Sequence, residues 1–173
     1  MALTVVDADV LAAVLDSESP HHHGARVALE LVIARRDVVA LPATAYADLL
    51  VDPLAAGEQF APVVDEFLAR LDARVVPIDR RVARHAAELM AAHDGFSLAT
   101  VFLLATACAA DASAVLVIDR ALPTPRALAA RFRVERIGRR GQLDSGGIGT
   151  PGGGADHGDL ARYTLTSSGA VSR

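Results

Sequence analysis

Hydrophobic positions along the first 137 residues follow two alternating patterns. Short aliphatic runs, typical of buried parallel strands, alternate with longer segments in which apolar residues recur every three or four positions, as on one face of a helix. This alternation predicts parallel strands in one sheet joined by right-handed helical crossovers. The predicted strands are residues 3–6, 38–41, 74–78 and 114–118, with an edge strand at 132–137, and the predicted helices are 9–16, 20–35, 44–51, 57–71, 80–92, 97–110 and 125–131.

The pattern stops near residue 140. Residues 141–173 hold nine of the 13 glycines of the chain, with Ser, Thr and Pro between them and no apolar period. Such a segment cannot bury enough apolar surface to offset the entropy of ordering it. The sequence therefore predicts one domain at residues 1–140 and a Gly/Ser-rich, disordered tail at 141–173.

Composition and charge exclude several classes of protein. All 17 basic residues are Arg, so no mechanism can use a lysine amine, and the net charge of −4 limits nucleic-acid contact to a local patch. The single Cys108 excludes an internal disulfide and a cysteine zinc site, as expected in a reducing compartment. The N-terminus lacks a basic leader, and the uncharged stretch 95–110 is shorter than the roughly 20 residues that cross a bilayer. We expect a cytoplasmic protein without a membrane partner.

Carboxylates stand where chemistry gathers in a parallel sheet. Asp7 and Asp119 each close an aliphatic run, and the carboxyl ends of parallel strands share one edge. Asp48 lies on a predicted helix soon after the strand that ends at Leu41-Pro42. Acids gathered at one edge are what a hard divalent cation needs.

Four segments together carry a resemblance that covers residues 3 to 137. They are Val5-Val6-Asp7-Ala8-Asp9, Ala47-Asp48-Leu49-Leu50, Ser97-Leu98-Ala99-Thr100 leading to Ala105-Thr106-Ala107, and Asp119-Arg120. Their order and spacing resemble those of PIN-domain ribonucleases, and among them the VapC-type toxins of bacterial toxin–antitoxin pairs. The resemblance implies an α/β fold, a three-layer α/β/α PIN-like domain with a central, mostly parallel sheet of four to five strands.

The resemblance also implies a metal site and its ligands. Asp7 and Asp119 would bind Mg²⁺ or Mn²⁺ directly, and Asp48 would take the place of the Glu that is usual in the family. Thr100 stands where the family has its third acid, and Arg120 adjoins the fourth. Asp9, at a position where the family usually has Asn, Ser or Thr, would restore the missing charge.

Each of these residues also has a purely structural interpretation. Asp7, Asp9 or Asp119 could cap the helix that follows a strand. Asp48 could be an ordinary polar position on a helix, and Thr100 could bond its own helix backbone.

Basic residues cluster near the end of the predicted domain. Residues 126–140 hold six Arg against one Glu, a local net charge of 6 − 1 = +5. Arg126, Arg131 and Arg133 are candidates for RNA-phosphate binding, because guanidinium groups suit phosphate oxygens. The alternatives are a solvated basic edge or a surface for an acidic partner. The run His21-His22-His23 is interpreted as a solvated helix start, because adjacent helical residues do not face one site.

Three functions remain open at this level. The first is a Mg²⁺-dependent endoribonuclease, the toxin of a VapBC-type pair, with RNA as substrate and a cognate antitoxin across its acidic cleft. The Ala-rich helices 9–16 and 44–51 would offer an apolar surface for a partner or for a homodimer. The second is a degenerate PIN domain that binds RNA or protein without cleavage. The third is a phosphotransferase, because Asp7-Ala8-Asp9 resembles the opening of haloacid-dehalogenase-type phosphatases, although the usual Lys is absent.

Overall fold

A computed structural model of the chain describes residues 1–118, 122, 128 and 130–138, together with the backbone of three short strands at 143–145, 164–165 and 171–172. Of the helix predicted at 125–131, the structure describes only Leu128, which is helical, and residues 130 and 131, which form a turn. Most of the predicted tail lies outside them as well, so its predicted disorder stays a prediction.

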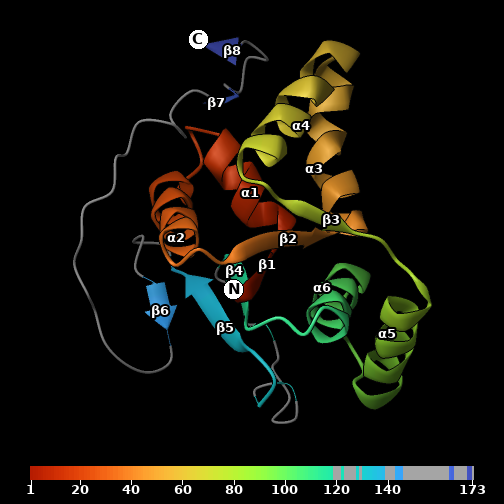
Figure 1. The fold of residues 1–173 in the computed structure, drawn as a ribbon. Helices are drawn as coiled ribbons and strands as arrows, with labels where there is room; N and C mark the ends of the chain where they lie inside the picture. The colour runs from red at the N-terminus through yellow and green to blue at the C-terminus, as the bar shows by residue number, and fades with distance from the viewer. Residues whose placement is uncertain are drawn as a thin grey trace.

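A single sheet forms the centre of the domain (Figure 1). Five strands run parallel in the order β3-β2-β1-β4-β5, and β6 pairs antiparallel with β5 at one edge. The α/β class and the parallel sheet predicted from the pattern are thus confirmed. The strands are β1 (Leu3–Val6), β2 (Val38–Pro42), β3 (Arg74–Val76), β4 (Ala114–Ile118), β5 (Arg133–Ile137) and β6 (Leu143–Ser145), with β7 (Thr164–Leu165) and β8 (Val171–Ser172) as a separate pair.

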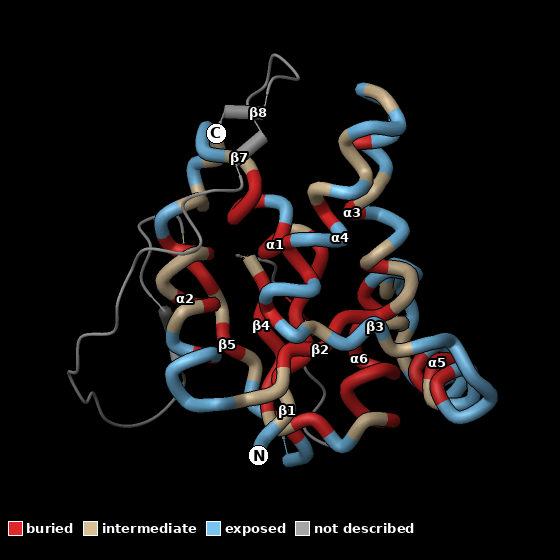
Figure 2. The backbone as a smooth tube through the Cα atoms, turned by 45° about the horizontal axis from the view of Figure 1, so that its top comes forward, coloured by how far each residue is buried: buried red, intermediate tan, exposed pale blue. Residues whose placement is uncertain are grey.

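Helices cover both faces of the sheet and complete a three-layer α/β/α fold (Figures 1 and 2). One face packs against the first four helices and the other against the last two, as the memberships of the two apolar clusters show. The helices are α1 (Ala8–Leu15), α2 (His22–Ala34), α3 (Ala43–Ala56), α4 (Ala61–Arg70), α5 (Arg80–Ala92) and α6 (Leu98–Ala109), with a short 3-10 turn at Glu58–Phe60.

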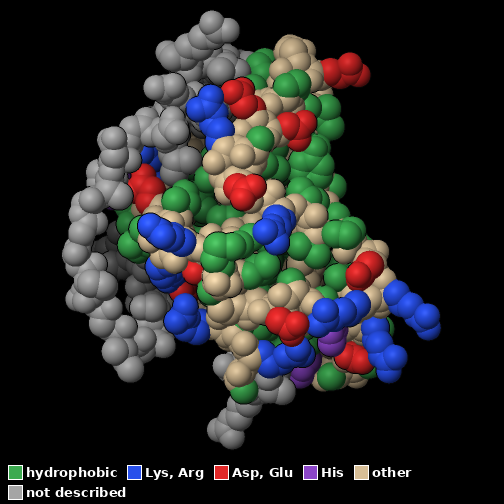
Figure 3. All heavy atoms as spheres, in the orientation of Figure 1, with side chains coloured by type: hydrophobic (Ala, Val, Ile, Leu, Met, Phe, Trp, Pro, Cys, Tyr) green, Lys and Arg blue, Asp and Glu red, His purple; other side chains and the backbone are tan. Residues whose placement is uncertain are grey.

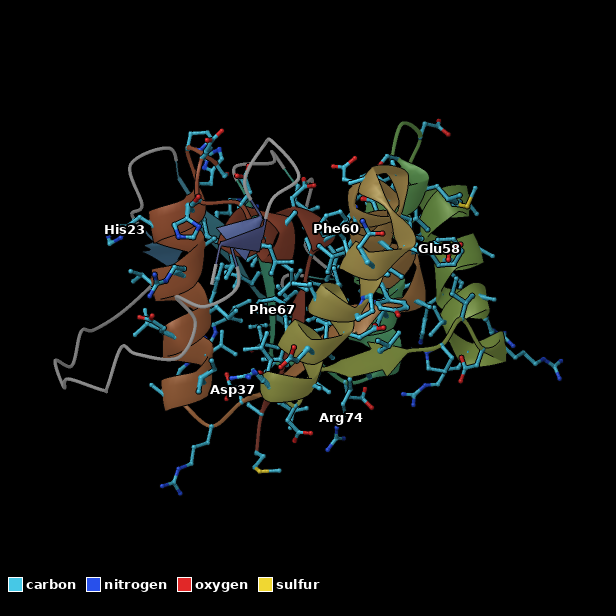
Figure 4. All side chains as sticks on the ribbon, turned by 90° about the horizontal axis from the view of Figure 1, so that it is seen from above. His23, Asp37, Glu58, Phe60, Phe67 and Arg74 are labelled. Carbon is cyan, nitrogen blue, oxygen red and sulfur yellow. The ribbon has the colours of Figure 1, made fainter. Side chains whose placement is uncertain are left out.

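Alternation along the strands explains the two clusters. Val6 of β1 faces the cluster that contains Phe67 of α4, and its neighbour Val5 faces the cluster around α6. Phe67 is fully buried and points from α4 into the interior (Figure 4). Burying such a side chain contributes about 1.5–3 kcal/mol, so both layers of apolar side chains hold the sheet rigidly between the helices.

Two predicted helix boundaries are wrong, each for a physical reason. The helix predicted to stop at residue 51 continues through Pro53 to Ala56, because burial of Leu49 and Pro53 outweighs the hydrogen bond that proline removes. The single helix predicted at 57–71 begins only at Ala61. Gly57 has φ 145°, a conformation outside any helix, and it separates α3 from the turn that leads into α4.

Helix α6 is apolar nearly all round, as predicted, and nine of its 12 residues are buried. No helix in the described part of the chain combines the length and apolar character that a bilayer crossing requires.

Candidate functional site

Asp7 lies at the carboxyl edge of the sheet, between β1 and α1. Its N–H donates to the carbonyl of Leu116 at 3.1 Å, which ties the end of β1 to β4. Its Oδ1 accepts from the N–H of Ala8 at 2.9 Å, so Asp7 is the N-cap of α1 and is buried, with 6% of its surface exposed. The capping role predicted as an alternative is therefore real for Asp7. It is wrong for Asp9, which lies in the first turn of α1.

Asp48 reaches the same place from a different element. Because α3 begins directly after β2, its second turn stands above the carboxyl edge, and Asp48 is exposed there. Asp7 and Asp48 line one pocket of about 190 Å³, which we name the Asp7–Asp48 pocket. Its remaining walls are Ala8, Pro42, Thr44, Ala45, Leu98, Ala99, Phe102 and Leu103.

A larger cleft of about 560 Å³, named here the α1–α3 cleft, adjoins the pocket and shares Asp48 with it. Four carboxylates and one imidazole face it: Asp9, Asp16, Asp48, Asp52 and His21. The cleft is also lined by Ile118, the last residue of β4, which directly precedes Asp119 in the sequence. Asp119 and Arg120 themselves lie outside the described residues.

Asp9 and Asp48 thus share the cleft, whereas Asp7 and Asp48 share the smaller pocket. Asp52, which sequence reasoning missed, stands four residues after Asp48 and so lies on the same helix face. The four-residue spacing between Asp48 and Asp52 is the sequence signal from which Asp52 could have been predicted.

Thr100 occupies the position of the missing acid but is turned toward its own helix start. It is 8% exposed, and its Oγ1 lies 2.9 Å from the hydroxyl of Ser97. Ser97 is the N-cap of α6, and its hydroxyl accepts from the N–H of Thr100 at 3.2 Å. The predicted bond of the Thr100 side chain to the backbone is replaced by this hydroxyl pair. Leu98 and Ala99, just before Thr100, line the Asp7–Asp48 pocket instead.

The oxygen donors at the pocket suit a hard cation that completes its coordination shell with water. Among the described residues no group of three or more His, Cys, Asp or Glu is placed to hold a metal ion, and the carboxylates described at this pocket are those of Asp7 and Asp48. Mg²⁺ is commonly held by one or two carboxylates together with waters and substrate phosphates. Two carboxylates in one pocket therefore fit Mg²⁺ or Mn²⁺, and Asp119 is the candidate third ligand.

The predicted RNA-binding arginines that the structure describes lie near the amino ends of the parallel strands, whereas the acids lie at the carboxyl ends. Arg133 pairs with Ala114 at the start of β4, about 13 Å from the end of that strand at 3.3 Å per residue. Arg131 donates to the carbonyl of Cys108 at 3.3 Å, and its side chain is 45% exposed. Their role in RNA binding stays a prediction, and it would apply to a surface remote from the acids. Arg126 lies outside the described residues.

An ion pair with one buried partner joins α2 to β5. Arg35, at the end of α2, donates to both oxygens of Glu135 in β5, at 3.0 and 3.1 Å. This hydrogen bond, opposed in part by burial, raises the pKa of Arg35 above its usual value. Glu135 is only 5% exposed, so the pair fastens α2 to the sheet.

The histidine run forms the start of α2, as predicted. His22 Nδ1 lies 2.9 Å from the carbonyl of Ala13, which links α2 to α1, while His23 is exposed on the outer side of α2 (Figure 4).

Comparisons with known proteins place this site in a family. The chain is similar in structure to VapC20 of Mycobacterium tuberculosis, described as a sarcin–ricin loop cleaving toxin, with a TM-score of 0.52, 16% identity, and coverage of 65% of this chain and 86% of that one. It is also similar to VapBC2 of Rickettsia felis bound to a promoter DNA fragment, with a TM-score of 0.54, 13% identity, and coverage of 78% and 98%. At these identities the likeness shows a shared fold. No curated protein matches the sequence.

The sequence model of the PIN domain matches residues 4–127, which contain Asp7, Asp48, Thr100 and Asp119. The match argues against the phosphatase interpretation of Asp7-Ala8-Asp9. The chain belongs to the PIN domain family.

Proposed function

We propose that this protein is a Mg²⁺-dependent endoribonuclease and the toxin of a VapBC-type pair. The observation that carries the proposal is the convergence of Asp7 and Asp48, from the end of β1 and from α3, on one pocket at the carboxyl edge of the sheet. Membership of the PIN family and the fold shared with VapC20 support it. We assign catalysis and metal binding to Asp7, Asp48 and Asp119, with Asp9 as an additional charge.

The burial and contacts of Asp7, Asp48 and Thr100 suggest a different role for each residue. A bound Mg²⁺ would supply an activated water and would neutralise charge on the phosphate. Asp7 is buried and fixed by its capping bond to Ala8, so its carboxylate is held in place before substrate arrives. Asp48 is exposed and can adjust to a substrate entering from solvent. Thr100 offers a neutral hydroxyl, held by Ser97, where the family has an acid.

The α1–α3 cleft suits a basic protein partner. Its four carboxylates would attract an Arg-bearing segment, and its apolar walls Leu15, Leu49 and Pro53 would receive aliphatic side chains. We propose the cognate antitoxin as this partner, which would cover Asp48 and so compete with RNA. Beside the cleft, Val51 and Leu54 of α3 are 58% and 48% exposed. Hydrophobic surface extends along α3 and α4 at the upper right of Figure 3, and we propose it for homodimer formation.

The alternative is a PIN domain that binds RNA or protein without cleavage, and it is supported by the replacement of the third acid by Thr100. Thr100 carries no charge, and Asp48 has a shorter side chain than Glu. A weaker site would still bind a partner through the α1–α3 cleft. For either function we propose a cytoplasmic location.

Metal-dependent cleavage of a fluorophore-quencher RNA separates the two functions. We expect cleavage with Mg²⁺ or Mn²⁺ that stops with EDTA and falls at least about 100-fold in Asp7→Asn, since even outer residues of metal sites contribute ten- to 100-fold. Asp94→Asn is the matched control, because Asp94 is an exposed carboxylate outside both cavities. Equal cleavage by wild type, Asp7→Asn and Asp94→Asn would refute the nuclease assignment. No cleavage of any RNA, with antitoxin binding retained, would favour the binding module.

A further inference from the structure

The Asp7–Asp48 pocket has two chemically different halves. Among the residues that the structure describes, Asp7 and Asp48 are the charged ones that line it, and they follow β1 and β2, at the start of α1 and in α3. The opposite wall comes from α6 and is wholly apolar, made of Leu98, Ala99, Phe102 and Leu103. A bare metal site needs no such wall, so the apolar half calls for a separate explanation.

Size and charge restrict what the apolar half can hold. About 190 Å³ is smaller than the 300–1,000 Å³ typical of sites for drug-sized ligands, yet it is several times the roughly 30 Å³ of a water molecule. One planar ring system fits this space. A phosphate group does not suit the apolar half, because the described residues of its wall, Leu98, Ala99, Phe102 and Leu103, carry no positive charge and no polar side chain.

The wall also presents the surface that nucleobases favour. Phe102 is partly buried and is the aromatic residue among the described lining residues, and Leu98 beside it is 60% exposed. Bases stack on aromatic side chains, and proteins that act on RNA commonly receive unpaired bases in this way. A base inside a duplex stays stacked with its neighbours and cannot enter a pocket of this kind.

We propose that the α6 wall, with Phe102 as its stacking surface, receives one unpaired nucleobase of the RNA next to the phosphate held at Asp7 and Asp48. This inference rests on the proposed nuclease function and adds to it a site for one base of the substrate, with Phe102 as the residue that positions it. Phe102 and Leu98 are then substrate-positioning residues. The distance between the α6 wall and the two carboxylates determines which phosphodiester bond is presented for cleavage.

Binding of a short, phosphorothioate-linked single-stranded RNA that carries one 2-aminopurine tests the proposal. The linkages resist cleavage, Mn²⁺ remains able to bind them, and 2-aminopurine fluorescence falls when the base stacks on an aromatic ring. The variants are Phe102→Leu, which removes the ring and keeps an apolar side chain, and Leu98→Ala, at an exposed position that the fold does not depend on. Phe96→Leu is the control, because Phe96 stacks on His93 with ring centroids 5.1 Å apart and lies outside the pocket.

We expect Phe102→Leu to raise the Kd about five- to tenfold and to abolish the quenching, the low end of what base stacking contributes. Leu98→Ala should weaken binding to a smaller degree, and Phe96→Leu should leave it unchanged. An RNA with an abasic site in place of 2-aminopurine should bind wild type and Phe102→Leu equally. A duplex of the same sequence should bind without quenching.

Two results would overturn the base pocket. One is an unchanged Kd and unchanged quenching in Phe102→Leu, and the other is an abasic RNA that binds wild type as tightly as the intact RNA. Either would leave an apolar side chain of a protein partner as the occupant. Wild-type cleavage with normal activity of Phe102→Leu would sink this inference alone. Phe102-dependent RNA binding without any metal-dependent cleavage would instead sink the nuclease function and keep the pocket.

Discussion

Replacing Thr100 by Asp restores the acid that the family has at this position, and it provides a quantitative test of the site. Thr100 is 8% exposed and adjoins Ala99, which lines the Asp7–Asp48 pocket. In Thr100→Asp a new carboxylate would enter a partly dehydrated region, where its charge is screened less than in water.

The magnitude follows from charge separation. Two unit charges about 4 Å apart interact with about 4 kcal/mol at the effective dielectric constant of 20 that suits protein sites. Dehydration of the new carboxylate and repulsion from Asp7 cancel much of this attraction to a cation. We therefore expect a net gain of about 1–2 kcal/mol, which is about five- to 30-fold tighter Mn²⁺ binding.

Without metal, the same substitution should change stability little. Repulsion from Asp7 destabilises the fold, whereas an acid in the first turn of α6 gains about 0.3–1 kcal/mol from the helix dipole, and the Ser97 hydroxyl, 2.9 Å from Thr100 Oγ1, can donate to it. Added Mn²⁺ should then raise the melting temperature of Thr100→Asp more than that of wild type.

Isothermal titration calorimetry with Mn²⁺ measures the effect. Thr100→Asn is the matched control, because it has the shape of Asp without the charge. If Thr100→Asp and Thr100→Asn bound Mn²⁺ with the same affinity, position 100 would lie too far from the ion to affect its binding. The absence of an acid at this position would then not weaken the metal site.

Three further predictions concern other parts of the molecule. Asp9→Asn should weaken Mn²⁺ binding by calorimetry, and an unchanged affinity would remove Asp9 from the site. Arg35→Met should lower the free energy of unfolding in urea by about 1–3 kcal/mol, because it removes both hydrogen bonds to the buried carboxylate of Glu135 and leaves the longer contact with Arg133 at 3.7 Å, while Arg36→Met at an exposed position should not; equal midpoints would contradict this. Burial raises the pKa of the Cys108 thiol above its ordinary value of 9.0, so Ellman's reagent at pH 8 should react slowly with native protein and fast in urea. The raised pKa of Cys108 belongs to the folded state, so the thiol also makes stability depend on pH. Its contribution to the free energy of unfolding is complete below the pKa of the thiol in the unfolded chain and is lost as the pH rises through the pKa of the thiol in the folded protein. Fast reaction in the native state would refute the burial of Cys108.

The sequence predicted the fold well because its signals are periodic and local. Aliphatic runs located every parallel strand, and a local signal of the same kind is Asp79, a residue type that favours N-caps, whose Oδ1 accepts from the N–H of Val82 at 2.8 Å at the start of α5. The errors arose where packing overrides local preference, as at Pro53, or where one backbone conformation divides a helix, as at Gly57. Neither effect has a period in the sequence.

The candidate site was predicted only in part. The strand ends identified Asp7, because its position depends on topology, and the family pattern identified Asp48. The carboxylate Asp16 and the wall residue Phe102 were not recognised as part of the site, because the carboxylates that they approach come from other elements of the chain, whereas Asp52 was missed although it stands four residues after Asp48 on α3. Sequence clustering made Arg131 and Arg133 candidates for RNA binding, which stays a prediction, and only the register of β5 shows that Arg133 lies at the amino end of its strand, away from the acids.

The central claim is that Asp7 and Asp48 hold the same divalent ion, and a double-mutant cycle on Mn²⁺ affinity tests it most directly. Calorimetry on wild type, Asp7→Asn, Asp48→Asn and the double variant gives the coupling between the two carboxylates. We predict that each single variant binds Mn²⁺ at least about tenfold more weakly, and that the two losses are non-additive by about 1 kcal/mol or more, as for residues that share one partner. Strictly additive losses, or affinities equal to that of wild type, would contradict a shared ion.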